Sequence, residues 1–369
     1  MLYIPSIFFL VMGFLQKRQF VLTICFVIFL WSLYAFSSGN ADFIIHQKRF
    51  YNYQDLISQT ELIYSFLMKM FNSIGSDYRT FLVCDSLFVC CVYSHFIRKN
   101  TNYPNLVLAL YLIYPFCMDV TMVRYTLAFA VILCGLDSLW RSNSIKKFLI
   151  CVMIGFLLHS SMILTLLFLL PRFFKDAGLK RVTLFGALGL FVCGSLVKML
   201  LNFVAKVSFF NLGEKSSIVL KSSLMKYDTD AYFRYGVKIF IAFLIMWFIF
   251  RQINKFLKKI QNVLQDSDSV KVSMIFFVSK LNLIALLIVP LVMFSADVFR
   301  LQLSLSVVFY VAIANYLELK KKYQPYKNSV LVQVGVVVYA LFNLYMWVLG
   351  GPNINSVWKP LFANNVLWG

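Results

Sequence analysis

The chain has 369 residues, of which 61% are hydrophobic and only 14% are charged. A soluble domain is about half apolar and about a quarter charged, so this composition excludes an ordinary globular protein. We predict an all-α, polytopic membrane protein, because a helix satisfies its own backbone hydrogen bonds when lipid surrounds it.

The charge is strongly positive, since 35 Lys and Arg oppose 15 Asp and Glu to give a formal net charge of +20. In a soluble protein this excess would suggest nucleic-acid binding. In a membrane protein the short cytoplasmic loops collect Lys and Arg, so we expect no nucleic-acid partner. The rest of the positive charge is available to an anionic substrate such as a phosphate.

The predicted elements are apolar segments, most of them close to the about twenty residues that cross a bilayer. In chain order they are 2–16, 19–36, 79–97, 104–119, 121–140, 148–170, 182–200, 236–250, 272–294, 298–317 and 328–350. No internal repeat or low-complexity linker separates them. We therefore predict about ten transmembrane helices in a single integral membrane domain, residues 1–369.

Six clusters of basic residues set the orientation, because such clusters favour the cytoplasmic side. They are Lys17–Arg18, Arg98–Lys99, Arg141–Lys147, Arg172–Arg181, Arg251–Lys259 and Lys320–Lys322. With all six inside, segments 37–78 and 201–235 and the tail 351–369 face outward, into the periplasm. Within the first of these, residues 54–72 have the apolar spacing of an interfacial helix.

Segment 148–170 breaks this alternation, because it runs from one basic cluster to the next. A single crossing would place Arg172–Arg181 outside. A re-entrant helical hairpin, broken near His159, would keep every cluster inside. Irregular backbone at membrane depth requires protein or water around it, so the hairpin reading also predicts a polar cavity near His159.

Three ionisable residues lie in or near apolar helices, where a charge is costly and therefore suggests function. Arg124 and Arg300 carry guanidinium groups, whose fixed fork of donors fits phosphate or carboxylate. Their structural alternatives are an ion pair of Arg124 with Asp119 or another acid, and of Arg300 with Asp297. His159 is a candidate base, because imidazole titrates near neutral pH. Its alternative is a buried histidine bonded to a carbonyl.

Four further candidates lie in the outward loop 201–235, and one lies in segment 37–78. The loop residues are Tyr227, Tyr232, Arg234 and Tyr235, which form either a solvated loop with aromatic anchors or a cover over an anionic substrate. Arg49 is a weaker candidate, because loop arginines are common. The eight cysteines form no CxxC pair, and with three histidines and no phosphate-loop motif we expect neither a metal site nor a cofactor.

Several short stretches, in order along the chain, resemble the Wzy-type polymerases of O-antigen and capsule, in the EpsG-like branch. The stretches are Arg49–Tyr53 followed by Glu61, Tyr114–Ala128 with Arg124, Lys146–Phe148 leading to His159–Ser161, and Phe299–Leu301. The family's outward R…G-D-Y-N-Y pattern lacks its Gly-Asp here, between Lys48 and Tyr53. This departure affects the role of Arg49.

The resemblance implies a polysaccharide polymerase with a GT-C-like fold in the bacterial inner membrane. Such an enzyme moves a glycan from undecaprenyl diphosphate onto a lipid-linked repeat unit, without a metal or cofactor. Arg124 and Arg300 would then hold the departing diphosphate, and His159 would deprotonate the acceptor hydroxyl. Arg49 and the four loop residues would bind the substrate. Its partners would be the undecaprenyl-diphosphate-linked oligosaccharide, membrane lipids and a chain-length regulator.

Two other classes of function fit parts of this pattern. A flippase or transporter of lipid-linked oligosaccharide would share the basic cavity, but internal two-fold similarity is then expected and none is visible. A membrane O-acyltransferase would use His159 as a base, but its catalytic groups would lie deeper or toward the cytoplasm. The outward placement of Arg124 and Arg300 favours the polymerase.

Overall fold

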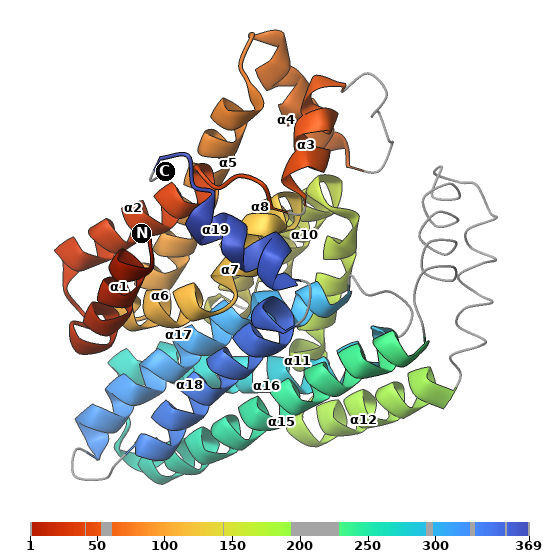
Figure 1. The fold of residues 1–369 in the computed structure, drawn as a ribbon. Helices are drawn as coiled ribbons and strands as arrows, with labels where there is room; N and C mark the ends of the chain where they lie inside the picture. The colour runs from red at the N-terminus through yellow and green to blue at the C-terminus, as the bar shows by residue number, and fades with distance from the viewer. Residues whose placement is uncertain are drawn as a thin grey trace.

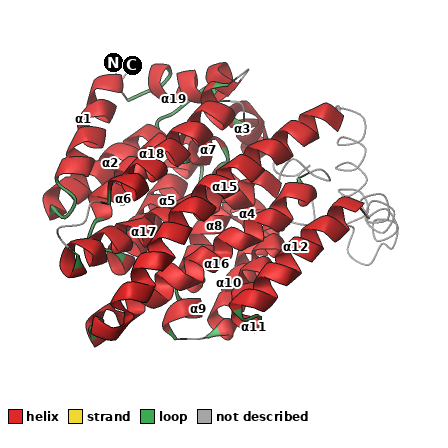
Figure 2. Cartoon of the chain, turned by 90° about the horizontal axis from the view of Figure 1, so that it is seen from below, coloured by secondary structure: helices red, strands yellow, loops and turns green. Residues whose placement is uncertain are grey.

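Helices form nearly all the regular structure in the part of the chain that the computed structural model describes (Figures 1 and 2). The described residues are 2–40, 42–52, 61–142, 144–192, 229–292, 298–324, 329–350 and 353–367. Within them the extended backbone pairs only at an isolated bridge between Ser37 and Asn365. The fold is therefore all-helical, as the composition predicts.

The helices fall in the following order along the chain, with 3₁₀ and π turns labelled η. They are α1 (Tyr3–Leu15), α2 (Phe20–Ala35), α3 (Phe43–Tyr51), α4 (Leu62–Ser73), α5 (Tyr78–Asn100), α6 (Pro104–Ile113), α7 (Phe116–Thr121), α8 (Val123–Leu136), α9 (Ser138–Arg141), α10 (Ile145–Leu158), η2 (Ser160–Leu169), α11 (Leu170–Phe173), α12 (Asp176–Val192), α15 (Thr229–Ile260), η3 (Gln261–Val263), η4 (Asp266–Asp268), α16 (Ser269–Leu291), α17 (Phe299–Tyr323), α18 (Val330–Leu344), η6 (Tyr345–Leu349), η7 (Ile354–Trp358) and α19 (Lys359–Ala363).

Each predicted apolar segment overlaps a helix, but the segments differ in whether they could cross a bilayer. Within the described residues, six helical stretches are long and apolar enough to do so: Tyr78–Asn100, Val123–Arg141, Phe233–Val263, Asp266–Leu291, Phe299–Tyr323 and Val330–Leu349. Four shorter apolar helical stretches accompany them: Tyr3–Leu15, Phe20–Ala35, Pro104–Ile113 and Ser160–Phe173. The chain is thus a multi-pass membrane protein, and the count of about ten crossings stays a prediction.

The core of the bundle is built around α17 and α8. Their candidate spans are 94% and 83% buried inside the protein, the largest shares of the six. α16 packs against α17, and α12 and α15 lie along α16 in the lower part of Figure 1. The first turn of each of the two central helices carries one of the predicted arginines, Arg124 in α8 and Arg300 in α17.

Several of the basic clusters meet at one end of the bundle, which we call the basic end. Three carboxylates hold it together in six ion pairs. Glu318 pairs with Arg18 and Lys271. Asp137 pairs with Lys99 and Arg141, and Asp268 pairs with Lys271 and Lys322. Each exposed pair stabilises the fold by about 0–1 kcal/mol. The convergence confirms that these clusters share one side of the molecule.

The cluster Arg172–Arg181 does not join the basic end, which corrects its predicted placement with the others. Asp176, inside this cluster, lies 2.7 Å from the Nζ of Lys280. Lys280 precedes Leu291, the last residue of α16, by eleven residues, or about 16 Å of helix. The cluster therefore lies beside the middle of α16.

The helix that begins at Ile145 ends at His159, where the sequence predicts a break. The backbone of His159 is extended, with φ −151° and ψ 119°. His159 contacts Arg300, at the end of the bundle where α16 stops and α17 starts. Asp176 is already back beside the middle of α16, so η2 and α11 return part of the way. The predicted break is confirmed, and re-entry into a membrane stays a prediction.

The two ends of the described chain meet, and Figure 2 shows the termini side by side. Tyr3 stacks on Phe362 with ring centroids 5.0 Å apart, and the Val366 amide donates to the Phe36 carbonyl at 2.8 Å. The guanidinium of Arg79 donates to the carbonyls of Ala35 and Ser37, both at 2.7 Å. These bonds satisfy carbonyls at the end of α2 that no helical amide reaches.

Gly13→Ala should lower the midpoint of thermal unfolding. The added Cβ would lie 2.7 Å from the Asn105 carbonyl oxygen and 2.8 Å from the Cβ of Ala109, so α1 would be forced away from α6. Such overpacking costs about 1–3 kcal/mol. Gly189→Ala is the control, because a Cβ there meets no heavy atom of the described residues within 4 Å. Unchanged unfolding of Gly13→Ala in detergent would contradict this packing.

Candidate functional site

Arg300 and His159 come together at the end of the bundle opposite the basic end. The Nη1 of Arg300 lies 3.4 Å from the Nε2 of His159. Tyr125 packs against both: its ring centroid is 5.5 Å from that of His159 at 80°, and 5.9 Å from the guanidinium carbon of Arg300. The hydroxyl of Ser304 fixes this tyrosine by donating to its oxygen at 3.0 Å. Three helices thus converge on one buried imidazole.

The two ring nitrogens of His159 face different groups. Its Nε2 faces Arg300, whose guanidinium has five donors and no acceptor. Its Nδ1 accepts from the Ser161 amide at 3.3 Å and lies 2.9 Å from the Ser161 Oγ. The imidazole is thus held from the Ser161 side, and its Nε2 lies beside the arginine, where an anion and a hydroxyl would both be drawn.

Arg124 forms an ion pair with Glu61, the residue before α4. The side chain of Arg124 is 22% exposed and that of Glu61 is 9% exposed, so the pair is largely shielded from solvent. The predicted alternative, an ion pair with Asp119 or another acid, is confirmed for another acid, because Glu61 lies 63 residues earlier in the chain. Asp119 instead accepts from the Tyr111 hydroxyl at 2.8 Å.

His46, in α3, belongs to the same neighbourhood, although the sequence gave it no role. It is 3% exposed, and its ring lies 6.3 Å from that of Tyr64, which is itself 6.0 Å from the guanidinium carbon of Arg124. Burial, with smaller contributions from the charges of Arg124, Arg49 and Arg300, lowers the pKa of His46 to about 3. Its spacing of three from Arg49 on one helix was the available signal.

Arg49 is half-buried on α3 and close to the same charges. Burial and the charge of Arg124 lower the pKa of Arg49, whereas Glu61 opposes that change. Four of the residues named in this cluster, Arg49, Arg124, His159 and Arg300, were predicted site residues. We call these four, together with His46, the arginine–histidine cluster.

Both arginines of the central helices lie in a first turn, where the helix dipole favours an anion and disfavours a cation. Arg124 is the second residue of α8, and Arg300 is the second residue of α17. The positive dipole ends and the guanidinium groups therefore add to one another. This arrangement weakens the fold in isolation and favours a bound anion such as phosphate.

The predicted loop residues are only partly within the described chain. Tyr227 lies outside the described residues, and the side chain of Tyr232 is likewise outside them. Arg234 is exposed on α15, so residues 229–235 form a helix where a loop was expected. Tyr235 stacks on Trp347 with centroids 5.3 Å apart at 5°. Its role in substrate binding stays a prediction.

Three stacked aromatic rings form a column that runs from Tyr235 through Trp347 to Phe299, the residue before Arg300. The ring centroids of Trp347 and Phe299 are 4.6 Å apart, and the angle between the ring planes is 14°. Trp347 is 2% exposed, so its faces are occupied by protein and offer no platform to a sugar. The column instead joins α15 and η6 to the first residue of α17, which positions the adjacent Arg300.

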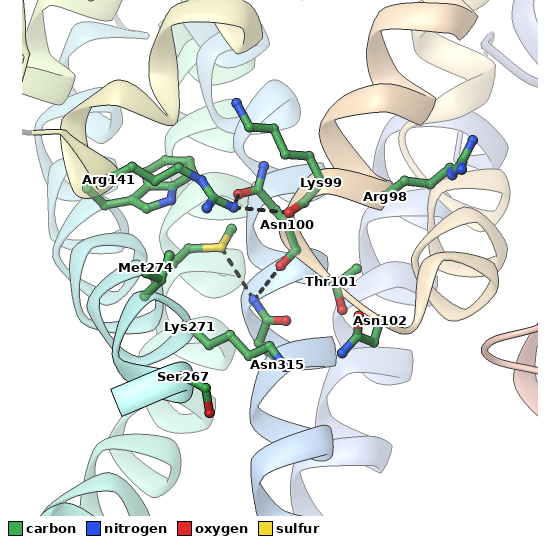
Figure 3. A pocket seen from close by; sticks show the side chains of 12 residues that line it. Arg98, Lys99, Asn100, Thr101, Asn102, Arg141, Ser267, Lys271, Met274 and Asn315 are labelled. Carbon is green, nitrogen blue, oxygen red and sulfur yellow. Dashed lines mark hydrogen bonds between the residues drawn. The ribbon is translucent and has the colours of Figure 1, made fainter. Parts of the chain in front are cut away.

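Well-formed pockets occur away from the arginine–histidine cluster. One of about 240 Å³ lies at the basic end (Figure 3), and an apolar groove of about 420 Å³ runs between Phe14 and Val338. Within the described residues no three His, Cys, Asp or Glu side chains gather closely enough to hold a metal ion. The candidate active site is thus defined by its charges and hydrogen bonds.

These features describe a multi-pass, helical membrane protein with a cluster of arginines and histidines at the ends of its central spans. The sequence model of the EpsG family matches residues 20–361, and the chain therefore belongs to the EpsG family. The match contains the whole arginine–histidine cluster. No curated protein and no solved structure matches the chain significantly.

His46 should make the fold sensitive to acid. Its pKa of about 3 in the folded protein lies below the ordinary value of 6.5, so its contribution is complete above pH 6.5 and is lost as the pH falls toward 3. At pH 5 the loss is about 2 kcal/mol. Thermal unfolding at pH 7.5 and pH 5 should show a smaller drop for His46→Gln than for the wild type.

His95→Gln is the matched control for this experiment, because His95 is an exposed histidine on α5. It should keep the wild-type dependence on pH. An equal drop in all three proteins would show that His46 is not the buried neutral histidine described above.

Proposed function

We propose that this protein is a lipid-dependent polysaccharide polymerase. It would transfer a glycan from undecaprenyl diphosphate onto a lipid-linked repeat unit at the periplasmic face of the bacterial inner membrane. Membership of the EpsG family supports a polymerase of the glycosyltransferase type. The observation that carries the proposal is the contact of Arg300 with the Nε2 of His159, close to a second partly buried arginine, Arg124.

The chemistry needs a base for the acceptor hydroxyl and a positive field for the leaving group. The acceptor hydroxyl gives its proton to the imidazole of His159 as its oxygen bonds to the anomeric carbon. The bond from that carbon to the diphosphate oxygen breaks, and the diphosphate leaves with the electron pair. Arg300 and Arg124 neutralise the charge that develops on it. A GT-C-like fold without a metal is consistent with these roles, because the arginines supply the positive charge that a metal would otherwise supply.

Glu61 explains how Arg124 is kept in place before substrate arrives. A buried guanidinium without an anion is costly, and its carboxylate partner removes most of that cost. An incoming diphosphate offers more acceptor oxygens and a higher charge than one carboxylate. We infer that it displaces Glu61 and takes over the guanidinium, and that α4 shifts as the pair separates.

Arg124→Ala and Arg300→Ala should each abolish long polysaccharide chains while the protein is still made. Removing one donor group to the developing charge costs about 10²–10³-fold in rate. Arg124→Lys and Arg300→Lys should restore little, because an ammonium lacks the planar fork. Gel analysis of surface polysaccharide from cells that carry each variant measures chain length.

Arg251→Ala is the control, since Arg251 is an exposed cation on α15 that lies against Trp247. Long chains in cells with Arg124→Ala would contradict the assignment of that residue. In a deletion strain, a band with a single repeat indicates loss of a polymerase. Absence of any repeat would instead favour a flippase, and unchanged length with altered acetyl content would favour an O-acyltransferase.

His159→Gln should lower the initial rate of chain extension by about 10²-fold, the size of a lost general base. Ser161→Ala should cost less, because it leaves the imidazole and the Ser161 amide and removes only the hydroxyl 2.9 Å from Nδ1. Purified protein and a defined lipid-linked repeat provide the assay, run with and without a chelator. A His159→Gln rate equal to that of the wild type would remove the base from the mechanism.

A further inference from the structure

The pocket at the basic end is lined by donors and cations, and no carboxylate is among its twelve lining residues. Four of them are cationic (Arg98, Lys99, Arg141 and Lys271), and five carry amide or hydroxyl groups (Asn100, Thr101, Asn102, Ser267 and Asn315). Its volume is about 240 Å³, which is room for several groups the size of water, at about 30 Å³ each. Such a lining suits an anion.

The carboxylates that balance these cations are not among the residues that line the pocket. Lys99 and Arg141 pair with Asp137, and Lys271 pairs with Glu318 at 2.9 Å. Arg18 and Lys322 also form ion pairs at the basic end. Together with the four cations that line the pocket they make six cations, against three carboxylates: Asp137, Asp268 and Glu318. A positive field therefore remains at the pocket after every carboxylate has been used.

Two buried polar atoms at the pocket lack partners among the described residues. Trp140 is 7% exposed, and its Nε1, which can only donate, has no acceptor. Asn315 is fully buried; its Nδ2 donates to the Asn100 carbonyl at 2.8 Å, but its Oδ1 has no donor. Leaving such groups unsatisfied destabilises the folded protein. An occupant with acceptor oxygens and a hydroxyl would satisfy both.

The inner donors and Arg98 are placed differently at the pocket. In Figure 3 the side chains of Asn100, Arg141 and Asn315 gather around hydrogen bonds, whereas Arg98 extends away from them. The guanidinium carbon of Arg98 lies 4.7 Å from the centre of the Phe20 ring, and Arg98 is exposed. Arg98 therefore adds positive charge at the exposed side, and the inner donors provide the hydrogen bonds.

We propose that this pocket is a second anion site, one that binds a phosphate ester at the basic end. Arg141 and Lys271 would hold the charge, and the Nε1 of Trp140 would donate to a phosphate oxygen. Asn315 follows Arg300 on α17 by fifteen residues, or about 22 Å of helix, so this site is separate from the arginine–histidine cluster. The phosphate would come from the headgroup of an anionic phospholipid or from a soluble phosphate compound.

The test is binding to the purified full-length protein in detergent. Inorganic phosphate is measured by equilibrium dialysis, and dioctanoyl phosphatidylglycerol by native mass spectrometry, with dioctanoylglycerol as the lipid that lacks phosphate. We expect one saturable equivalent. Trp140→Phe keeps the ring and removes the donor, and it should weaken binding about tenfold, the effect of one charge-assisted hydrogen bond. Lys271→Gln should weaken it at least as much.

Lys258→Gln is the matched control, because Lys258 is an exposed cation in the last turn of α15 and does not line the pocket. Binding of the lipid alone would assign the site to a headgroup, and binding of phosphate alone to a soluble compound. No saturable binding of either probe, or binding that Trp140→Phe leaves unchanged, would overturn the proposal. If Lys271→Gln fails to fold, the binding measured for Trp140→Phe still tests the proposal. Neither readout depends on polymerase activity.

Discussion

The constraint that shapes this molecule is the cost of bringing charge into an apolar bundle. A guanidinium removed from water needs a carboxylate, a hydrogen-bond acceptor or an anion close by. Arg124 has Glu61, and Arg300 lies against the imidazole of His159. The positions of α4 and of the break after α10 follow from these needs, because each supplies a partner to an arginine on a central helix.

The two ends of the bundle meet this constraint differently. At the basic end, lysines and arginines share Asp137, Asp268 and Glu318 in pairs that tie separate helices together. At the opposite end, arginines occupy the first turns of α8 and α17, where the helix dipole works against them. The first arrangement stabilises the fold. The second lowers its stability and favours a nearby anion, which is the role that we propose for the arginine–histidine cluster.

The sequence predicted the helices and four residues of the candidate site, but it missed the contacts among them. Arg124 was chosen because an arginine at membrane depth is unusual, and its closest acid along the chain, Asp119, was the natural partner to suggest. The actual partner is Glu61, on another helix. His46 was missed for a similar reason: nothing local shows that α3 folds its imidazole against Tyr64 and close to three arginines.

The sequence by itself determined the all-helical membrane class, the approximate ends of the helices and the break at His159. Apolar runs, basic clusters and a polar His-Ser-Ser step are local signals, and lipid leaves the backbone few alternatives to a helix. Only the tertiary structure decided which side chains meet. The rotation and register of helices far apart in the chain set those distances, and a change of one residue turns a helical side chain by about 100°.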